Sequence, residues 1–398
     1  MRVNGSVAAF VAAATLVAAQ DRFPAMSDYS SEEVQNGTAF ADVKQIAFDN
    51  MQSNVASRPG AFCTMENADI RQEWRQMSQE LRKGFTNAVT CLQNLPPQRM
   101  TADEASTYPG VKSRYDEYVA THINYTLNIH DTADFLAWHR GYIHYLEQDL
   151  QNLCDYQGKL PYWEWSLDAE APQNSELFNG DEYSMGSNGQ YIPDRTPVYL
   201  GLQQVTLPLG TGGGCVTGGP FANYTVNMGP VAAPNLTALD YQFGYNPRCL
   251  SRDLSPGLTQ QYLTWTNVTT LILENTLVEE FQGVMQADST YSAADNKFGV
   301  HGCGHYAVGS IMADFYASPA DPIFFLHHAQ VDRMWSIWEN IDPYRRLTAI
   351  HGTSTMLNDP PSAEMSLTDI MPYGLVADDI AFSEMMDTFA GPLCYYYQ

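Results

Sequence analysis

Apolar residues recur every three or four positions along several stretches of the chain, as they do on the buried face of an amphipathic helix. The longest such stretch begins at Asp131 or Thr132 and predicts a helix with six apolar side chains on one side: Phe135, Trp138, Tyr142, Leu146, Leu150 and Leu153. A second helix is predicted over 85–95, where Pro96 and Pro97 would end it.

Two more helices are predicted from possible N-terminal caps. Asn67 could cap a helix whose apolar positions have helical spacing, namely Ile70, Trp74, Met77 and Leu81. Ser113 could open a helix that ends near His122.

The second half of the chain alternates between helical and loop-like sequence. Residues 263–285 are predicted to be helical despite their threonine content, and another helix is predicted to follow Pro322 and to contain His328. Residues 168–255 are instead rich in Gly, Pro, Asn, Ser and Thr. Their glycine-rich part, 210–219, is not followed by the Lys-Ser/Thr pair of a phosphate-binding loop, so we expect surface loops there. The sequence therefore predicts a mainly α-helical fold with long loops and little β structure.

The first residues have the pattern of a secretory signal peptide. Arg2 supplies a positive charge, residues 7–17 form an apolar run, and the small residues at 17–19 offer a cleavage site. The run is too short to span a bilayer, and no other uninterrupted apolar stretch of 20 residues follows it. We therefore expect residues 1–19 to be removed and the mature chain to be secreted, soluble and free of the membrane.

The charge of the chain narrows its possible partners. The formal net charge is −25 and the isoelectric point is near 4.5. Such an acidic chain repels nucleic acid and anionic membranes, and it suits a small neutral substrate. Solubility alone accounts for most of these charges.

Seven of the nine histidines fall into two clusters: His122, His130 and His139, then His301, His305, His327 and His328. Two histidines four residues apart share one face of a helix. Such a pair could simply pack in a core, but a third imidazole from a second helix would complete a metal site that is open on one side. Imidazole suits copper, zinc, iron and nickel. A zinc hydrolase would also need a glutamate base, as in His-Glu-x-x-His, and none is placed there.

The two clusters predict one domain. About 160 residues separate His139 from His301, yet the two sets must converge if both hold metal ions that bridge one small molecule. Adjacent helical residues point about 100° apart, so only one of His327 and His328 can bind the same ion. We expect residues 20–398 to form this single domain.

The motifs around these histidines resemble those of the type 3 copper proteins, which are the tyrosinases, catechol oxidases and haemocyanins. The spacing His122-x7-His130-x8-His139 and the segment Phe135-Leu-Ala-Trp-His-Arg140 are similar to the first copper site. His301-x3-His305, Asp321-Pro-Ile-Phe and His-His-x-x-Val-Asp-Arg-x-Trp335 are similar to the second. Pro161-Tyr-Trp-Glu-Trp165 matches the segment after the first site. The resemblance extends over roughly 61–398, which is the extent of one domain. Within the family, the chain resembles the short secreted fungal polyphenol oxidases most.

The resemblance implies a four-helix bundle around a dinuclear copper centre. It implies that one copper is held by His122, His130 and His139, and the other by His301, His305 and His328. It also implies that Asp332 is an acid that holds a histidine or an arginine in place. His327 would then be a neighbouring core imidazole, His144 a structural residue on another helix face, and His351 an ordinary loop residue.

Three residues bear on the substrate that the resemblance implies. Phe315 lies 13 positions before His328, where the family has a gate over the first copper. Gly302 follows His301, where efficient monophenol hydroxylators often carry Asn, and glycine has no side chain to position a water. Tyr306 would shape the pocket wall and can stack on an aromatic ring. Together they favour a catechol oxidase that converts o-diphenols to o-quinones while O2 is reduced to water, with o-aminophenols as a second candidate substrate class.

Three other functions stay open at this point. The first is a tyrosinase that also hydroxylates monophenols, and the second is a haemocyanin-like oxygen carrier, which would bind O2 without consuming catechol. The third is a secreted protein that has lost its metal, although all six expected ligands are present. A C-terminal lid domain, which many fungal tyrosinases carry, is not expected after the closing Cys394-Tyr-Tyr-Tyr-Gln398.

Seven cysteines in a secreted chain suggest disulfides with one thiol left over. We predict the pairs Cys63–Cys394, Cys91–Cys154 and Cys215–Cys249, with Cys303 free, although the sequence does not fix this pairing. Sequons occur at five asparagines: Asn36, Asn124, Asn223, Asn235 and Asn267. We expect N-glycans at Asn223, Asn235 or Asn267, because they flank loop-like sequence, and not at Asn124, which is close to His122.

Overall fold

The computed structural model describes residues 23–234 and 236–398 of the chain. The predicted signal peptide over 1–19 and the sequon at Asn235 therefore lie outside the described residues. The fold is mainly helical, as predicted. Its α-helices are α1 (Ser31–Asn36), α2 (Thr38–Ala56), α3 (Gln79–Asn94), α4 (Arg114–Ile129), α5 (Phe135–Cys154), α6 (Pro256–Tyr262), α7 (Trp265–Glu274), α8 (Val278–Gln286), α9 (Gly299–Val308), α10 (Ile323–Ile341) and α11 (Pro343–Arg346).

The β structure consists of short strands, which pair two by two. They are β1 (Asp69–Arg71), β2 (Gly189–Tyr191), β3 (Val198–Leu200), β4 (Val205–Leu207), β5 (Gly213–Val216), β6 (Thr225–Val226), β7 (Arg248–Cys249), β8 (Ile370–Met371), β9 (Ile380–Ala381) and β10 (Tyr395–Tyr397). The pairs are β1 with β10, β2 with β5, β3 with β4, β6 with β7, and β8 with β9. Six of these strands lie in the predicted loop region over 168–255, and short 3-10 helices such as η2 (Trp74–Gln76) join other elements.

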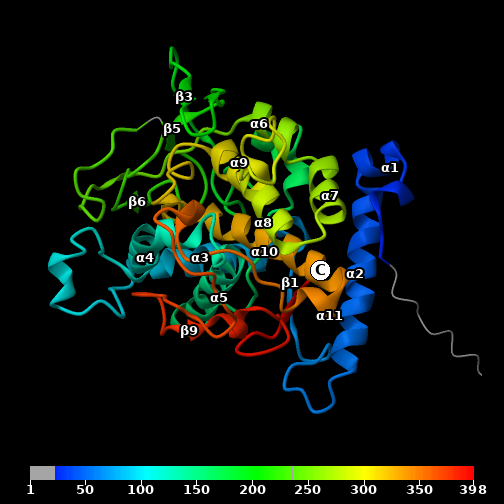
Figure 1. Cartoon of the computed structure of the whole chain (residues 1–398). Helices are drawn as coiled ribbons and strands as arrows, with labels where there is room; N and C mark the ends of the chain where they lie inside the picture. The colour runs from blue at the N-terminus through cyan, green and yellow to red at the C-terminus, as the bar shows by residue number, and fades with distance from the viewer. Residues whose placement is uncertain (1–22, 235) are drawn as a thin grey trace, which may run out of the picture.

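Helix α10 forms the centre of the molecule. Every one of its residues is buried, and α2, α5, α7 and α9 pack against it. A helix that is covered on all sides belongs to a core, which fits its run of large apolar side chains. Figure 1 shows α10 in the middle of the molecule, α2 along one side and the β3 hairpin projecting from one end.

Four helices carry the two histidine clusters, namely α4, α5, α9 and α10. The Ser113 side chain caps α4 by accepting a hydrogen bond from the Asp116 N–H, as predicted, but the helix continues past His122 to Ile129. Helix α3 includes most of the segment predicted over 85–95, but it begins six residues earlier and ends at Asn94, two residues before Pro96. Helix α5 begins three or four residues later than predicted, because Asp131 has a left-handed backbone with φ of 49°.

The helix predicted after Asn67 is wrong. The Asn67 side chain closes a local turn, in which its Oδ1 accepts from the Thr64 N–H at 2.7 Å and its Nδ2 donates to the Phe62 carbonyl at 2.8 Å. The chain then forms β1 and not a helix. Ile70, which the helical spacing places with the core residues, is 43% exposed. The apolar spacing was therefore accidental, and the backbone there pairs with a distant strand.

The long helix predicted over 263–285 is in fact two helices. Helix α7 ends at Glu274 and α8 begins at Val278. At the break, the Asn275 carbonyl accepts a hydrogen bond of 2.6 Å from the Trp338 indole of α10. A partner from another helix thus satisfies a carbonyl that a continuous helix would have satisfied.

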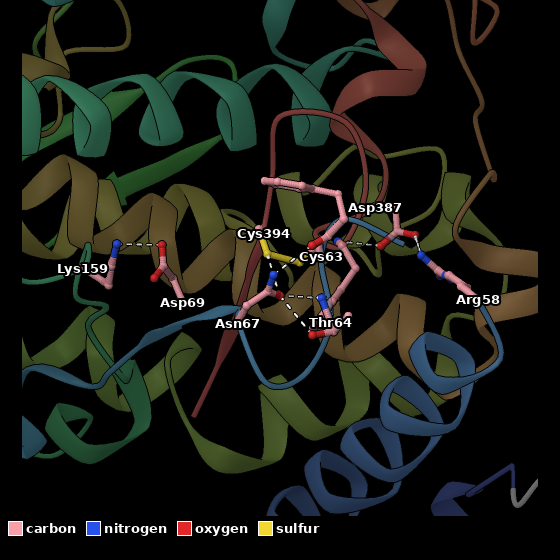
Figure 2. Close-up of a disulfide and its surroundings, with 10 residues drawn as sticks. Arg58, Cys63, Thr64, Asn67, Asp69, Lys159, Asp387 and Cys394 are labelled. Carbon is pink, nitrogen blue, oxygen red and sulfur yellow. Dashed lines mark hydrogen bonds and ion pairs between the residues drawn. A yellow bond between two sulfur atoms is a disulfide. The ribbon is translucent and has the colours of Figure 1, made fainter. Parts of the chain in front are cut away.

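The segment that follows α2 meets the C-terminal strand at one parallel strand pair. Asp69 pairs with Tyr395 and Arg71 with Tyr397. The adjacent disulfide joins Cys63 to Cys394, and Figure 2 shows it beside Asn67 and Thr64. The chain is therefore closed between residues 331 positions apart in sequence.

The disulfide prediction is confirmed in full. Besides the Cys63–Cys394 bond, the structure contains the bonds Cys91–Cys154 and Cys215–Cys249, and Cys303 is a buried free thiol. No helix within the described ranges has the length and apolar character that crossing a membrane requires.

Candidate metal centre

The first histidine cluster is built by α4 and α5. His122 lies inside α4, His130 is the residue just past its C-terminal end, and His139 lies in the second turn of α5. All three are buried, and one nitrogen of each lies within 4.8 Å of the others. Because α4 ends just before His130, the ring of His130 can turn toward the rings of His122 on α4 and His139 on α5.

Backbone carbonyls fix the orientation of these three rings. The Nδ1 atoms of His122, His130 and His139 donate to three carbonyls, those of Tyr316 at 2.7 Å, Thr126 at 2.9 Å and Phe135 at 2.7 Å. A carbonyl only accepts, so each neutral ring carries its proton on Nδ1 and keeps a lone pair on Nε2. The Nε2 atoms of His122 and His139 are buried without a hydrogen-bond partner. A metal ion is the partner that such converging lone pairs fit.

The second cluster is built by α9 and α10. The Nε2 of His305 lies 3.2 Å from the Nε2 of His301 and 3.2 Å from the Nε2 of His328. The Nδ1 of His305 donates to the Met312 carbonyl at 3.0 Å, which again leaves Nε2 as the free donor to a metal. Three Nε2 atoms therefore converge, one turn of α9 supplying two and α10 the third.

His327 lies beside this cluster, but its ring has a different role. The Trp165 indole N–H donates to its Nδ1 at 3.1 Å. An indole can only donate, so Nδ1 accepts and the neutral ring carries its proton on Nε2. A protonated Nε2 has no lone pair for a metal. A Cβ on Gly304 would lie 2.1 Å from the His327 ring, so glycine is required for this imidazole to fit.

The two clusters face each other across a short gap. The rings of His139 and His328 stack with centroids 4.3 Å apart, and the rings of His130 and His301 are 5.8 Å apart. Phe324 stacks on His328 with centroids 4.1 Å apart. The histidines therefore form one centre with two sets of donors, enclosed by aromatic side chains.

Burial keeps the imidazoles of this centre uncharged. It lowers the pKa of His130 to about 4 and that of His305 to about 3, and it lowers the pKa values of His122, His139, His301 and His328 well below the usual range. Neutral imidazoles have lone pairs available at pH 7. A set of neutral nitrogen donors suits copper or zinc and does not suit magnesium or calcium, which prefer oxygen.

One edge of the centre is open. His305, Gly302 and Phe315 are partly exposed, and the Phe315 ring centroid lies 4.9 Å from that of His130. Tyr306 is also partly exposed and packs against Phe298, with ring centroids 4.9 Å apart. Of these residues, Phe315 thus lies beside a histidine of the first cluster, and Tyr306 follows the partly exposed His305.

Asp332 lies one turn beyond His328 on α10 and holds arginines, one of the two alternatives predicted for it. Its Oδ1 accepts from Arg140 Nε at 2.6 Å, and its Oδ2 accepts from the hydroxyls of Tyr395 and Tyr397 at 2.6 Å each and from Arg71 at 3.4 Å. Burial alone would raise the pKa of this carboxyl, but Arg140 and Arg71 hold it below its usual value. Because Arg140 follows His139, this carboxylate links α5 and α10, two of the four histidine-bearing helices, to the C-terminal strand.

The two remaining histidines lie outside both clusters, as predicted. His144 is buried on α5, and burial lowers its pKa to about 4. His351 is exposed, with its Nε2 3.4 Å from the Tyr291 hydroxyl. Sequence reasoning did not identify the roles of Trp165 and Phe324. Both lie within motifs used for the family resemblance, so the signal was present but did not indicate the contact.

Known proteins are similar to the part of the chain that carries both histidine clusters. Residues 112–341 match the common central domain of tyrosinase. The chain is 39% identical to Tyrosinase P of Aspergillus terreus over 341 residues, covering 83% of this chain and 92% of that protein. It is 35% identical to an N-acetyl-6-hydroxytryptophan oxidase of Emericella nidulans over 375 residues, covering 90% of this chain and 96% of that protein. A mutant polyphenol oxidase from Thermothelomyces thermophila has a similar solved structure, with a TM-score of 0.85 and 36% identity, covering 92% of this chain and 100% of that chain.

Proposed function

The chain belongs to the tyrosinase family, and from that premise we propose that it oxidises o-diphenols to o-quinones while O2 is reduced to water. It is a tyrosinase-family oxidase, and the family implies a dinuclear copper centre. The observation that carries the proposal is the convergence of imidazole Nε2 atoms in two facing clusters. We include o-aminophenols among its substrates, because they can lose two electrons in the same way.

We propose that His122, His130 and His139 hold one copper, and that His301, His305 and His328 hold the other. When bound, a copper pair supplies the route by which two electrons pass from a catechol to O2. The support for this ligand set is the position of the protons. Four of the six rings donate from Nδ1 to a backbone carbonyl, which leaves their Nε2 atoms for the metal.

The chain's own residues prepare this chemistry in three ways. The carbonyls of Thr126 and Phe135 hold imidazoles of the first cluster in one tautomer, so no ring has to turn when a metal binds. Phe324 and Phe135 pack against the rings and exclude water from the buried side. Asp332 is a positioning residue, since it fixes Arg140 next to His139 without touching the centre itself.

The open edge supports a preference for o-diphenols. Gly302 offers no side chain that could orient a water toward a phenol proton, and Phe315 narrows the approach beside His130. We propose Phe315 as the gate and Tyr306 as part of the wall. Tyr316, the residue after Phe315, has a different role, because its backbone carbonyl accepts a hydrogen bond from His122.

We also propose that the protein is secreted and carries a signal peptide over residues 1–19. Three disulfides support this, because such bonds persist in oxidising compartments. Asn223 is the sequon that we propose for an N-glycan, since it is exposed in a turn before β6. Asn267 lies in the first turn of α7, within the segment predicted to be helical, and its Nδ2 donates to the carbonyls of Gln261 and Tyr262 at 2.9 Å each.

Oxygen uptake by the copper-loaded protein tests the proposed substrate class. Catechol and phenol are supplied in parallel, and the copper-free protein is the control. We expect uptake with catechol and little with phenol. Uptake with both, after a lag, would make the protein a tyrosinase that hydroxylates monophenols. Reversible O2 binding without loss of catechol would contradict the proposal and favour an oxygen carrier.

A further inference from the structure

A pocket of about 600 Å³ lies apart from the histidine centre, on another side of α10. Its walls come from α2, α10 and the β1–β10 strand pair. On α10, Arg333, Ile337 and Asn340 line it, and at about 100° per residue they point roughly 120–180° away from His328. The pocket is thus distinct from the metal centre, although both are built on the same helix.

The lining of this pocket is amphipathic. Its apolar surface comes from Phe48 and Met51 of α2, Ile337 of α10 and Tyr396 of β10. Its charged side chains are Lys44 of α2 and Arg333 of α10. No Asp or Glu side chain lines it, although the chain has 45 acidic residues and a net charge of −25. A cationic pocket in so acidic a chain is a local exception that points to an anionic ligand.

Lys44 has no carboxylate partner of its own. Within 23–234 and 236–398, no Asp or Glu forms an ion pair with its ammonium group. The side chain is half-buried, and its pKa is lowered, first by burial and then by the charge of Arg333. A cation held beside another cation in a partly apolar site is stabilised by any anion that binds between or beside them.

Arg333 is paired with Glu164 but keeps one donor without a partner. One of its terminal nitrogens, Nη1, donates to Glu164 at 2.6 Å and to Gln330 at 3.2 Å, while its buried Nε has no hydrogen-bond partner. The Arg333 side chain is 3% exposed. Lys44 and Arg333 therefore share the field of Glu164, and Glu73 also acts on Arg333, so no carboxylate serves Lys44 alone.

We propose that this pocket binds a small amphipathic carboxylate. The carboxylate group would pair with the Lys44 ammonium, which has no ion-pair partner among the described residues. The apolar body would lie against Phe48, Met51 and Ile337. The volume is in the range of sites that enclose small organic molecules, and the mixture of apolar walls with a few polar groups is typical of such sites.

Calorimetry on the copper-loaded full chain tests this proposal with octanoate as the probe. Neutral 1-octanol has the same chain length and tests whether the charge matters. We expect saturable octanoate binding and at least tenfold weaker binding of 1-octanol. Lys44→Met keeps the length of the side chain and removes its charge, so we expect octanoate to bind about tenfold more weakly. Lys83→Met is the matched control, because Lys83 lies on α3 and pairs with Glu182. Its octanoate affinity should equal that of the wild type.

Charge reversal gives a second, independent readout. Lys44→Glu should abolish octanoate binding and create binding of octylammonium, which the wild type should not bind. The proposal is overturned if octanoate shows no saturable binding to the wild type, if it binds as weakly as 1-octanol, or if Lys44→Met leaves its affinity unchanged. Catechol oxidation by both Lys44 variants should match the wild type, which separates a failure of this proposal from a failure of the copper proposal.

Discussion

At the scale of single residues, the position of one proton decides which imidazole nitrogen can bind a metal. The sequence predicts which histidines gather, because their spacing on helices is visible. It does not reveal their tautomers, which depend on backbone carbonyls such as those of Met312 and Tyr316. The same limit applies to His327. Only the fold shows that the Trp165 indole donates to its Nδ1 and so leaves His328 as the available donor.

Copper content distinguishes the two neighbours. We expect His328→Ala to lower the copper content from two ions to about one per chain, because one cluster loses a converging Nε2. His327→Gln should keep two ions, since its side-chain oxygen can still accept from Trp165. Metal analysis after dialysis measures both. The reverse pattern, with copper lost from the His327 variant alone, would make His327 the ligand.

Gly302 can be tested because the structure has room for a side chain. A Cβ at this position would meet only the Phe298 Cβ, at an ordinary distance of 3.7 Å, so a side chain can begin there without displacing a neighbour. We expect Gly302→Asn to raise the ratio of phenol to catechol turnover severalfold, because its amide can position a water at the open edge. Gly302→Ala is the control, and it should leave the ratio near that of the wild type. An unchanged ratio in the asparagine variant would show that this position does not set the specificity.

At the scale of elements, the histidine-bearing helices α5 and α10 were predictable because their apolar and polar patterns are long. The failures occurred where a distant partner decides the local structure. Residues 69–71 form a strand because β10 is available to pair with them, and the break before α8 coincides with a bond from Trp338. Helix α2, which packs against α10, was not predicted at all.

The contacts of Asp332 link α5, α10 and β10, so its loss should affect stability more than most substitutions. Asp332→Asn should lower the free energy of unfolding by about 3–5 kcal/mol, because Arg140 and Arg71 lose a buried counter-charge. Tyr395→Phe removes one hydrogen bond to the same carboxylate and should cost about 1–2 kcal/mol. Urea unfolding of the metal-free proteins measures both values. A loss below about 0.5 kcal/mol for Asp332→Asn, the size of an ordinary surface substitution, would refute a stabilising role for this network.

At the scale of the whole molecule, the fold brings together segments that lie far apart in sequence. Helical periodicity contains no information about the meeting of residues near 69 with those near 395, whereas the predicted pair Cys63–Cys394 anticipated it. The Cys63–Cys394 bond lies beside two ion pairs, Arg58–Asp387 at 2.5 Å and Lys159–Asp69 at 2.6 Å (Figure 2). Closure at this point keeps β10, and with it the tyrosines that hold Asp332, against the core.

Loop length predicts which disulfide matters most. The sequence separation is 331 residues for Cys63–Cys394 and 34 for Cys215–Cys249. In the chain-entropy model, removing the longer closure by Cys63→Ser with Cys394→Ser should cost about 2 kcal/mol more than removing the shorter one in the same way. Thermal and urea unfolding of the two double variants tests this. An equal or larger loss in the Cys215–Cys249 variant would show that local strain or unfolded-state structure outweighs closure entropy.

The central claim is that two facing histidine clusters make this chain an oxidase of o-diphenols. The most direct measurement follows oxygen and catechol together in one vessel, for the copper-loaded wild type and for His305→Ala. We expect one O2 to be consumed for every two catechols oxidised, and no consumption by the variant, because His305 lies 3.2 Å from both other Nε2 atoms of its cluster. Undiminished turnover by His305→Ala, or catechol loss without oxygen uptake, would contradict the account.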